Sequence, residues 1–118
     1  MATVLLVDDE PLVRRLVALI LEEQGFTVLA ADSGSEAIRL SRSHPGEIDL
    51  LVSDVVMPGM DGPTLATELL ADQPTLPVLF MSGGCEPLHL DKDKPFRFVS
   101  KPFDVAALLI TVRDLTKH

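Results

Sequence analysis

Short apolar runs alternate with helix-like segments along the whole chain, and this alternation limits the possible folds more than any other feature. The runs typical of strands are residues 3–7, 26–31, 50–53, 77–81 and 96–99. The first, third and fourth are nearly continuous in apolar residues, which indicates strands buried on both faces, whereas the second and fifth are weaker and fit the edges of a sheet. Strands that alternate with helices form a parallel sheet covered on both faces.

Two helices are predicted in the first half of the chain. Pro11 suits the first turn of a helix that ends near Gly25, a residue typical of a C-terminal cap. Ser33 and Glu36 have the spacing of a capping box at the start of the next helix, which ends before Pro45. Apolar residues at helical spacing in the first helix are Leu12, Leu16, Leu19 and Ile20.

The second half predicts two regular helices and one irregular element. One helix opens at residues 62–63, and Asp104 can cap the last helix. Between Ser82 and Phe96, two glycines and two prolines leave room for about two helical turns, so we expect a short or irregular fourth helix there. The apolar stripe of the last helix is formed by Val105, Leu108, Leu109, Val112 and Leu115.

Together these elements predict one α/β domain that spans residues 1–118. Five strands and about five helices in alternation, joined by right-handed crossovers, favour the flavodoxin-like fold. This fold is a doubly wound five-stranded parallel sheet with strand order 2-1-3-4-5.

Charge and hydropathy narrow the functions that we expect. The formal charge of −8, with no basic stripe, argues against nucleic-acid binding by this domain. No apolar run reaches membrane-spanning length, so we expect no direct membrane insertion. The chain enters its first apolar run directly after Met1, without a basic leader, which favours a cytoplasmic location.

Polar residues follow four of the predicted strands at the edge where doubly wound sheets bind ligands. They are Asp8 and Asp9 after the first strand, Asp54 after the third, Ser82 after the fourth and Lys101 after the fifth. Carboxylates that crowd together repel one another, and a hard cation such as Mg²⁺ relieves this repulsion. A lysine and a hydroxyl suit phosphate oxygens. An aspartate in such surroundings can attack phosphorus and become an acyl phosphate.

Four motifs at these positions resemble the receiver domains of two-component response regulators. They are Val7-Asp8-Asp9-Glu10-Pro11, the run from Ser53-Asp54 through Met57-Pro58 to Met60-Asp61-Gly62, Met81-Ser82-Gly83, and Ser100-Lys101-Pro102-Phe103. The resemblance covers essentially the whole chain. The Met-Ser-Gly and Lys-Pro-Phe motifs, with the atypical segment between them, are most similar to receivers attached to hybrid histidine kinases.

The resemblance implies a role for each matching residue. Asp54 would be the phosphorylated residue, Asp9 a direct Mg²⁺ ligand, and Asp8 an assisting group that acts largely through water. The backbone carbonyl of Val56 would be the third protein ligand of the metal. Lys101 would pair with the phosphate.

Two further residues would carry the conformational switch, again by resemblance. Ser82 would be the hydroxyl that closes on the phosphate, and Phe98 the aromatic side chain that swings inward with it. An ordinary buried aromatic is an equally good reading of Phe98. The bond between Lys101 and Pro102 is expected to be cis, an isomer that X-Pro bonds adopt readily.

The resemblance implies phosphorelay signalling rather than conventional turnover. The phosphohistidine of a histidine kinase or histidine phosphotransfer domain would donate to Asp54, and the receiver would assist its own phosphorylation and dephosphorylation. An aspartate-nucleophile phosphatase is one alternative, but it needs a second aspartate where this chain has Val56. A pseudo-receiver that is never phosphorylated is another, and the presence of Asp9, Asp54 and Lys101 argues against it.

Overall fold

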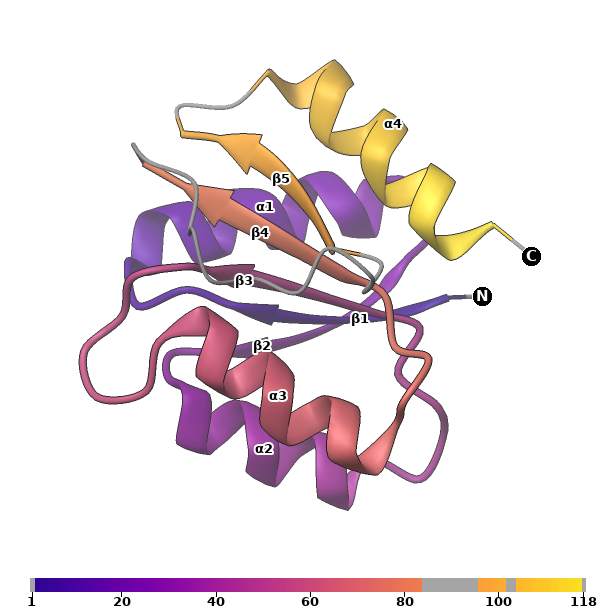
Figure 1. The fold of residues 1–118 in the computed structure, drawn as a ribbon. Coiled ribbons are helices and arrows are strands. Elements are labelled where there is room, and N and C mark those ends of the chain that lie inside the picture. Colours follow the sequence, from indigo (N-terminus) through magenta and orange to yellow (C-terminus); the bar gives the residue numbers. More distant parts are fainter. Residues whose placement is uncertain (1, 84–95, 102–103, 118) are drawn as a thin grey trace.

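The computed structural model describes residues 2–83, 96–101 and 104–117, which form one parallel sheet with helices on both faces (Figure 1). The strand order is β2-β1-β3-β4-β5, as predicted, and every neighbouring pair of strands is parallel. The strands are β1 (Thr3–Val7), β2 (Thr27–Ala31), β3 (Leu50–Asp54), β4 (Val78–Ser82) and β5 (Phe96–Ser100). The predicted irregular helix between Ser82 and Phe96 falls on residues 84–95, outside the described residues.

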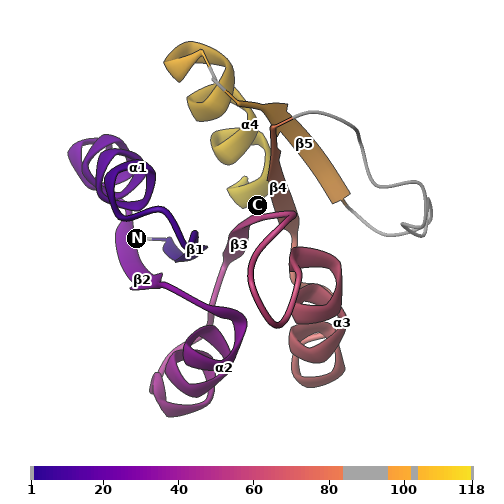
Figure 2. The ribbon, with the colours of Figure 1, turned by 90° about the vertical axis from the view of Figure 1, so that its left-hand side faces the viewer.

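The described helices lie on both faces of the sheet, as the end-on view of Figure 2 shows. One face carries α1 (Pro11–Glu23) and α4 (Val105–Thr116), and the other carries α2 (Gly34–Ser43) and α3 (Gly62–Asp72). Side chains of β1 alternate between the two layers: Leu5 and Val7 pack with α2 and α3, whereas Val4 and Leu6 pack with α1 and α4. The central strands are therefore buried on both sides, as their apolar sequences predict.

Helix ends follow the predicted caps, with one addition. The Ser33 hydroxyl accepts a hydrogen bond from the Glu36 amide at 3.2 Å, and the Asp104 carboxylate accepts one from the Ala106 amide at 2.8 Å. Gly25 follows α1 with a φ of +94°, a conformation that favours glycine. The sequence placed the start of α3 at Gly62 but did not identify its cap, Asp61, which accepts a hydrogen bond from the Thr64 amide at 2.8 Å.

The leucines whose helical spacing predicts α1 point outward from the sheet. The helix buries Val17 and Leu21 against the sheet, while Leu12, Leu16 and Leu19 are 84%, 52% and 53% exposed. These three positions are spaced four and three residues apart, so they share one side of the helix. We call Leu12, Leu16 and Leu19 the outer α1 face.

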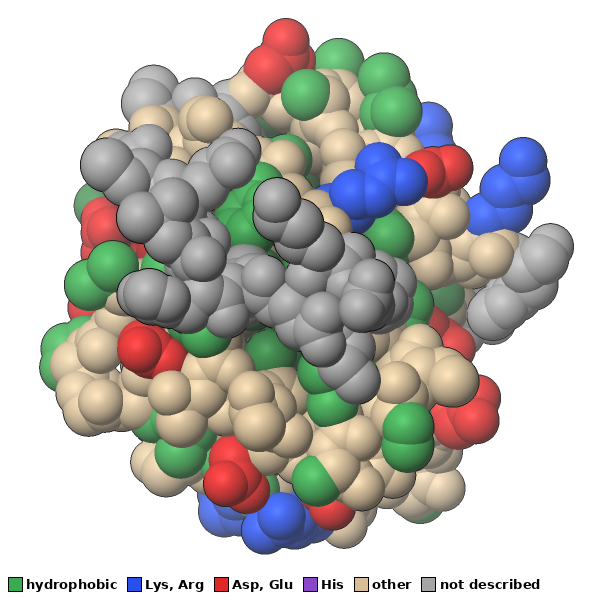
Figure 3. Space-filling model, in the orientation of Figure 1, with side chains coloured by type: hydrophobic (Ala, Val, Ile, Leu, Met, Phe, Trp, Pro, Cys, Tyr) green, Lys and Arg blue, Asp and Glu red, His purple; other side chains and the backbone are tan. Residues whose placement is uncertain are grey.

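Among the described residues on the side drawn in Figure 3, Lys and Arg side chains form small separate groups rather than one large basic region. Two exposed ion pairs lie at 3.1 Å (Arg42 with Asp72) and 2.8 Å (Arg97 with Asp114). Among the described helices, none combines the length and the apolar character that crossing a membrane requires.

Candidate functional site

The sheet topology brings the predicted polar residues to one edge. Asp54 and Ser82 are the last residues of β3 and β4, while Asp8 and Lys101 come directly after β1 and β5. Because all these strands are parallel, their carboxyl ends meet at the same edge of the sheet. A cavity of about 440 Å³ opens there, lined by Glu10, Asp54, Val55, Val56, Ser82, Gly83 and Lys101.

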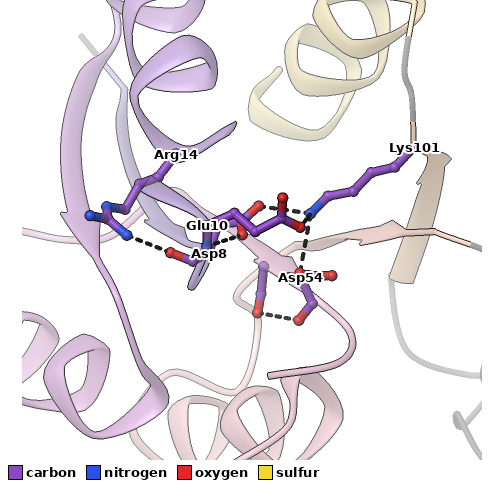
Figure 4. A network of polar contacts seen from close by, with 6 residues as sticks. Asp8, Glu10, Arg14, Asp54 and Lys101 are labelled. Atoms are coloured by element: carbon purple, nitrogen blue, oxygen red, sulfur yellow. Dashed lines mark hydrogen bonds and ion pairs between the residues drawn. The ribbon is translucent and has the colours of Figure 1, made fainter. Parts of the chain in front are cut away.

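The ammonium group of Lys101 links the acidic residues at this edge of the sheet (Figure 4). Its Nζ atom lies 2.9 Å from Oδ2 of Asp8 and 3.1 Å from Oδ2 of Asp54, and donates a hydrogen bond to each. Oε1 of Glu10 is 3.8 Å from the same nitrogen. The side chains of Asp8, Asp54 and Lys101 are only 0%, 11% and 15% exposed, so this contact is shielded from water.

Burial and these contacts shift the two central pKa values. Burial raises the pKa of Asp54, and the neighbouring Asp8 charge adds to the rise, which the hydrogen bond from Lys101 offsets only in part. Burial alone would lower the pKa of Lys101, but its hydrogen bonds to Asp8 and Asp54 outweigh burial and raise that pKa. Lys101 therefore stays charged at neutral pH, as a partner for phosphate oxygens must.

Asp8 is fully buried and is held through both its side chain and its backbone. Its amide donates to the Ala31 carbonyl at 3.2 Å, and its Oδ1 accepts from the Glu10 amide at 2.9 Å. Its backbone carbonyl accepts a hydrogen bond from Nη1 of Arg14 at 2.8 Å. With Lys101 on Oδ2, every polar group of Asp8 has a partner.

The backbone of Asp54 is held as closely as its side chain. The Ser53 hydroxyl donates to the Asp54 carbonyl at 2.9 Å, and the Gly62 amide donates to the Val55 carbonyl at 2.8 Å. A Cβ atom placed on Gly62 would lie 2.3 Å from the Asp54 carbonyl oxygen, so only glycine fits at this first position of α3. The sequence predicts the start of a helix at Gly62 but not this close contact with Asp54.

The carboxylates at this edge suit a magnesium ion. Oxygen atoms from Asp8, Glu10 and Asp54 lie within 4.8 Å of one another, and hard oxygen ligands are those that Mg²⁺ prefers. Glu10 follows the Asp8-Asp9 pair directly, but the motif alone predicts no role for it. Asp9 is partly exposed and does not belong to this trio among the described residues, so its role as a direct ligand stays a prediction.

Of the remaining predicted site residues, Ser82 and Val56 line the cavity and Phe98 does not. Ser82 is 8% exposed, while Val56, at the rim, is 79% exposed. Phe98 is partly buried and stacks on Phe80, with ring centroids 5.5 Å apart and an interplanar angle of 28°. The switch roles of Ser82 and Phe98 and the carbonyl ligand of Val56 stay predictions. The Lys101-Pro102 bond involves a residue outside the described part of the chain.

Comparison with known sequences shows which protein family this chain resembles. Residues 4–113 match the sequence profile of the response regulator receiver domain family. The chain is 44% identical over 117 residues to the sensor kinase CckA of Brucella abortus (strain 2308), covering 97% of this chain and 12% of that protein. It is 35% identical over 116 residues to the transcriptional regulatory protein GlrR of Escherichia coli (strain K12), covering 96% of this chain and 26% of that protein. The chain thus spans a minor part of both relatives.

Solved structures show the same similarity in three dimensions. The receiver domain of the hybrid histidine kinase CckA superimposes with a TM-score of 0.86 at 37% identity, covering 98% of this chain and all of that one. The chemotaxis protein CheY4 of Vibrio cholerae gives a TM-score of 0.86 at 28% identity, covering 98% of both chains.

Proposed function

Because this chain belongs to the response regulator receiver domain family, we propose that it relays signals by accepting a phosphoryl group on Asp54 from a phosphohistidine. The observation that carries this proposal is the place of the Asp54 carboxylate in the strand-end cavity, 3.1 Å from the Lys101 ammonium group. The donor is a histidine kinase or a histidine phosphotransfer domain. The chain is a signalling domain, not a turnover enzyme, and it works in the cytoplasm.

In this reaction a carboxylate oxygen of Asp54 attacks phosphorus while the phosphorus–nitrogen bond of the donor histidine breaks. Lys101, released from Asp54 as the acyl phosphate forms, offsets negative charge on the phosphoryl oxygens. Ser82, at the end of the neighbouring strand, donates to another of these oxygens. Its movement toward the phosphate, followed by Phe98, produces the active conformer.

The acidic edge is where a magnesium ion would bind. We assign it to Asp8, Asp9 and Asp54, with the Val56 backbone carbonyl as a further ligand and the Glu10 carboxylate beside them. The ion supplies positive charge that offsets carboxylate repulsion and the charge on the transferred group.

Magnesium removal is expected to stop phosphorylation. The protein is incubated with acetyl phosphate and MgCl₂, and its intact mass is measured over time; one phosphoryl group should be gained. Excess EDTA should prevent the gain, because Asp8 and Asp54 then repel the incoming anion. Phosphorylation at an equal rate in EDTA would contradict the magnesium assignment. A chain that gains no phosphoryl group with or without magnesium would instead support the pseudo-receiver alternative.

The donor domain must contact the surface around the cavity to bring its histidine to Asp54. The outer α1 face is suited to this contact, because α1 begins directly after Glu10, a residue that lines the cavity. Its three exposed leucines lie along one side of the helix and form an apolar surface that a partner can cover. Val56, at the rim, adds a further exposed apolar side chain. We propose that the phosphohistidine-bearing domain docks on the outer α1 face.

Leu16→Glu is expected to slow phosphotransfer from a protein donor by about tenfold or more, because it places a charge in the centre of an apolar contact. Glutamate keeps the helix propensity, so the fold is retained. The rate is measured from phosphorylated histidine kinases, using the fastest donor of a panel, and from acetyl phosphate. Ile110→Glu on α4, which is 67% exposed in the parent, is the matched control.

Only the protein donor should distinguish these two variants. Acetyl phosphate needs no docking surface, so both variants should react with it at the parental rate. Equal slowing of both variants with the protein donor, or none, would contradict docking at the outer α1 face.

A further inference from the structure

Arg14 connects α1 to the acidic edge of the sheet. From the first turns of the helix, its guanidinium group reaches back to the backbone carbonyl of Asp8, where Nη1 donates a hydrogen bond at 2.8 Å (Figure 4). The Arg14 amide also donates to the Glu10 carbonyl at 2.9 Å, so the residue is anchored where the helix begins. The side chain is partly buried, which limits competition from water for this contact.

The Asp8 carbonyl belongs to the peptide group that joins Asp8 to Asp9. This group is planar, so the direction of its carbonyl also fixes its amide and the entry of the chain into Asp9. The other polar groups of Asp8 are held by Ala31, Glu10 and Lys101, none of which contacts this carbonyl. Without Arg14, the peptide plane between Asp8 and Asp9 can rotate while Asp8 itself stays in place.

We propose that Arg14 is a positioning residue for the magnesium site, which it serves by fixing the peptide group between Asp8 and Asp9. This inference rests on the proposed function, since it concerns the same acidic edge. Arg14 acts on the metal site through the backbone and does not bind the ion itself. Its hydrogen bond orients the loop that carries Asp9 and Glu10 for metal binding. Groups that orient metal ligands in this way commonly change metal affinity by about 10- to 100-fold when removed.

A role of Arg14 through charge alone makes the opposite prediction. A guanidinium group near a cation site repels the cation, so removing it would tighten magnesium binding. A role in helix stability alone makes a third prediction: the melting temperature without magnesium would change, but the magnesium concentration that gives half of the stabilisation would not. The half-saturating concentration therefore separates the three roles.

The test compares Arg14→Met with the parent and with Arg15→Met. Arg15 is the next residue, is exposed, and carries the same charge, so its substitution controls for charge and for helix propensity. Thermal melts are followed by circular dichroism at increasing MgCl₂, because the chain has no Trp or Tyr to report by fluorescence. Bound magnesium raises the melting temperature by mass action.

We expect Arg14→Met to raise the half-saturating magnesium concentration about tenfold, and Arg15→Met to leave it within about twofold. An Arg14→Met titration equal to that of Arg15→Met, or tighter than the parent, would overturn the inference. If Arg14→Met does not fold, Arg14→Ala decides, because alanine keeps high helix propensity and removes the donor of this hydrogen bond. A rise of about threefold or more supports positioning, and a titration equal to the parent overturns it.

The same titration separates this inference from the proposed function. A parent protein that shows no magnesium stabilisation would overturn both. A parent that responds, with Arg14→Met responding identically, would overturn only the role of Arg14.

Discussion

Asp54→Asn is expected to abolish phosphorylation of the chain. The amide of asparagine is not a nucleophile comparable to a carboxylate, and no acyl phosphate can form on it. The Lys101 ammonium group, which lies 3.1 Å from Asp54, can still contact the amide oxygen, so the cavity keeps its shape. The measurement is intact mass after incubation with acetyl phosphate and magnesium, followed by the same reaction with a phosphohistidine donor.

Asp61→Asn is the matched control for this substitution. Asp61 is an exposed aspartate in the loop that follows β3, and its carboxylate caps α3, a role that asparagine fills equally well. This control should be phosphorylated like the parent. A phosphoryl group gained by Asp54→Asn under the same conditions would place the phosphoacceptor elsewhere and contradict the proposed function.

Asp54→Asn is expected to fold as stably as the parent, so that its loss of phosphorylation can be assigned to the missing carboxylate. Burial raises the pKa of Asp54, which means that the ionised carboxylate is less favourable in the folded chain than in the unfolded chain. Asparagine removes this cost and the repulsion from Asp8, at the loss of one ion pair with Lys101. The variant should therefore melt at or above the parental temperature without magnesium, as circular dichroism can check.

Gly62→Ala is expected to lower stability by about 1–3 kcal/mol, the usual range for inserting a carbon into a packed position. The added Cβ would lie 2.3 Å from the Asp54 carbonyl oxygen and 3.1 Å from Cα of Val55. Both are backbone atoms, which cannot rotate away as a side chain can, so α3 or the end of β3 has to move. The loss should appear although alanine is the better helix former by up to about 1 kcal/mol.

The substitution displaces the backbone of Asp54, which is the phosphoacceptor, so phosphorylation of Gly62→Ala should slow as well. Urea unfolding followed by circular dichroism measures stability, and the acetyl phosphate reaction measures the rate. Gly46→Ala is the control, since its added Cβ meets nothing closer than 3.4 Å. If Gly62→Ala keeps the parental stability and phosphorylation rate, the backbone accommodates the added Cβ and the prediction is wrong.

The sequence predicts the sheet well because its signals are local. Continuous apolar runs predict the buried strands. The rule that ligands bind at the carboxyl ends of parallel strands then selects Asp8, Asp9, Asp54, Ser82 and Lys101. Their gathering at one edge then follows from the strand order, which the structure confirms.

Contacts between elements are harder to predict. Helix α1 is apolar on two sides, so periodicity alone does not decide whether the side of Leu16 or that of Val17 packs on the sheet. The contact of Gly62 with the Asp54 carbonyl depends on where α3 begins in space, which no spacing in the sequence reveals. The same holds for Arg14, whose spacing from Asp8 gives no sign of a backbone hydrogen bond.

The outward position of Leu12, Leu16 and Leu19 has a consequence for how such a domain diverges after gene duplication. These side chains contribute little to the core, and exchanges at exposed positions usually change stability by less than about 0.5 kcal/mol. Buried residues such as Asp8 and Val17 do not have this freedom. A duplicated copy can therefore acquire a new partner through a few substitutions on one side of a single helix. The insulation of one signalling pathway from another can evolve while the phosphate chemistry stays unchanged.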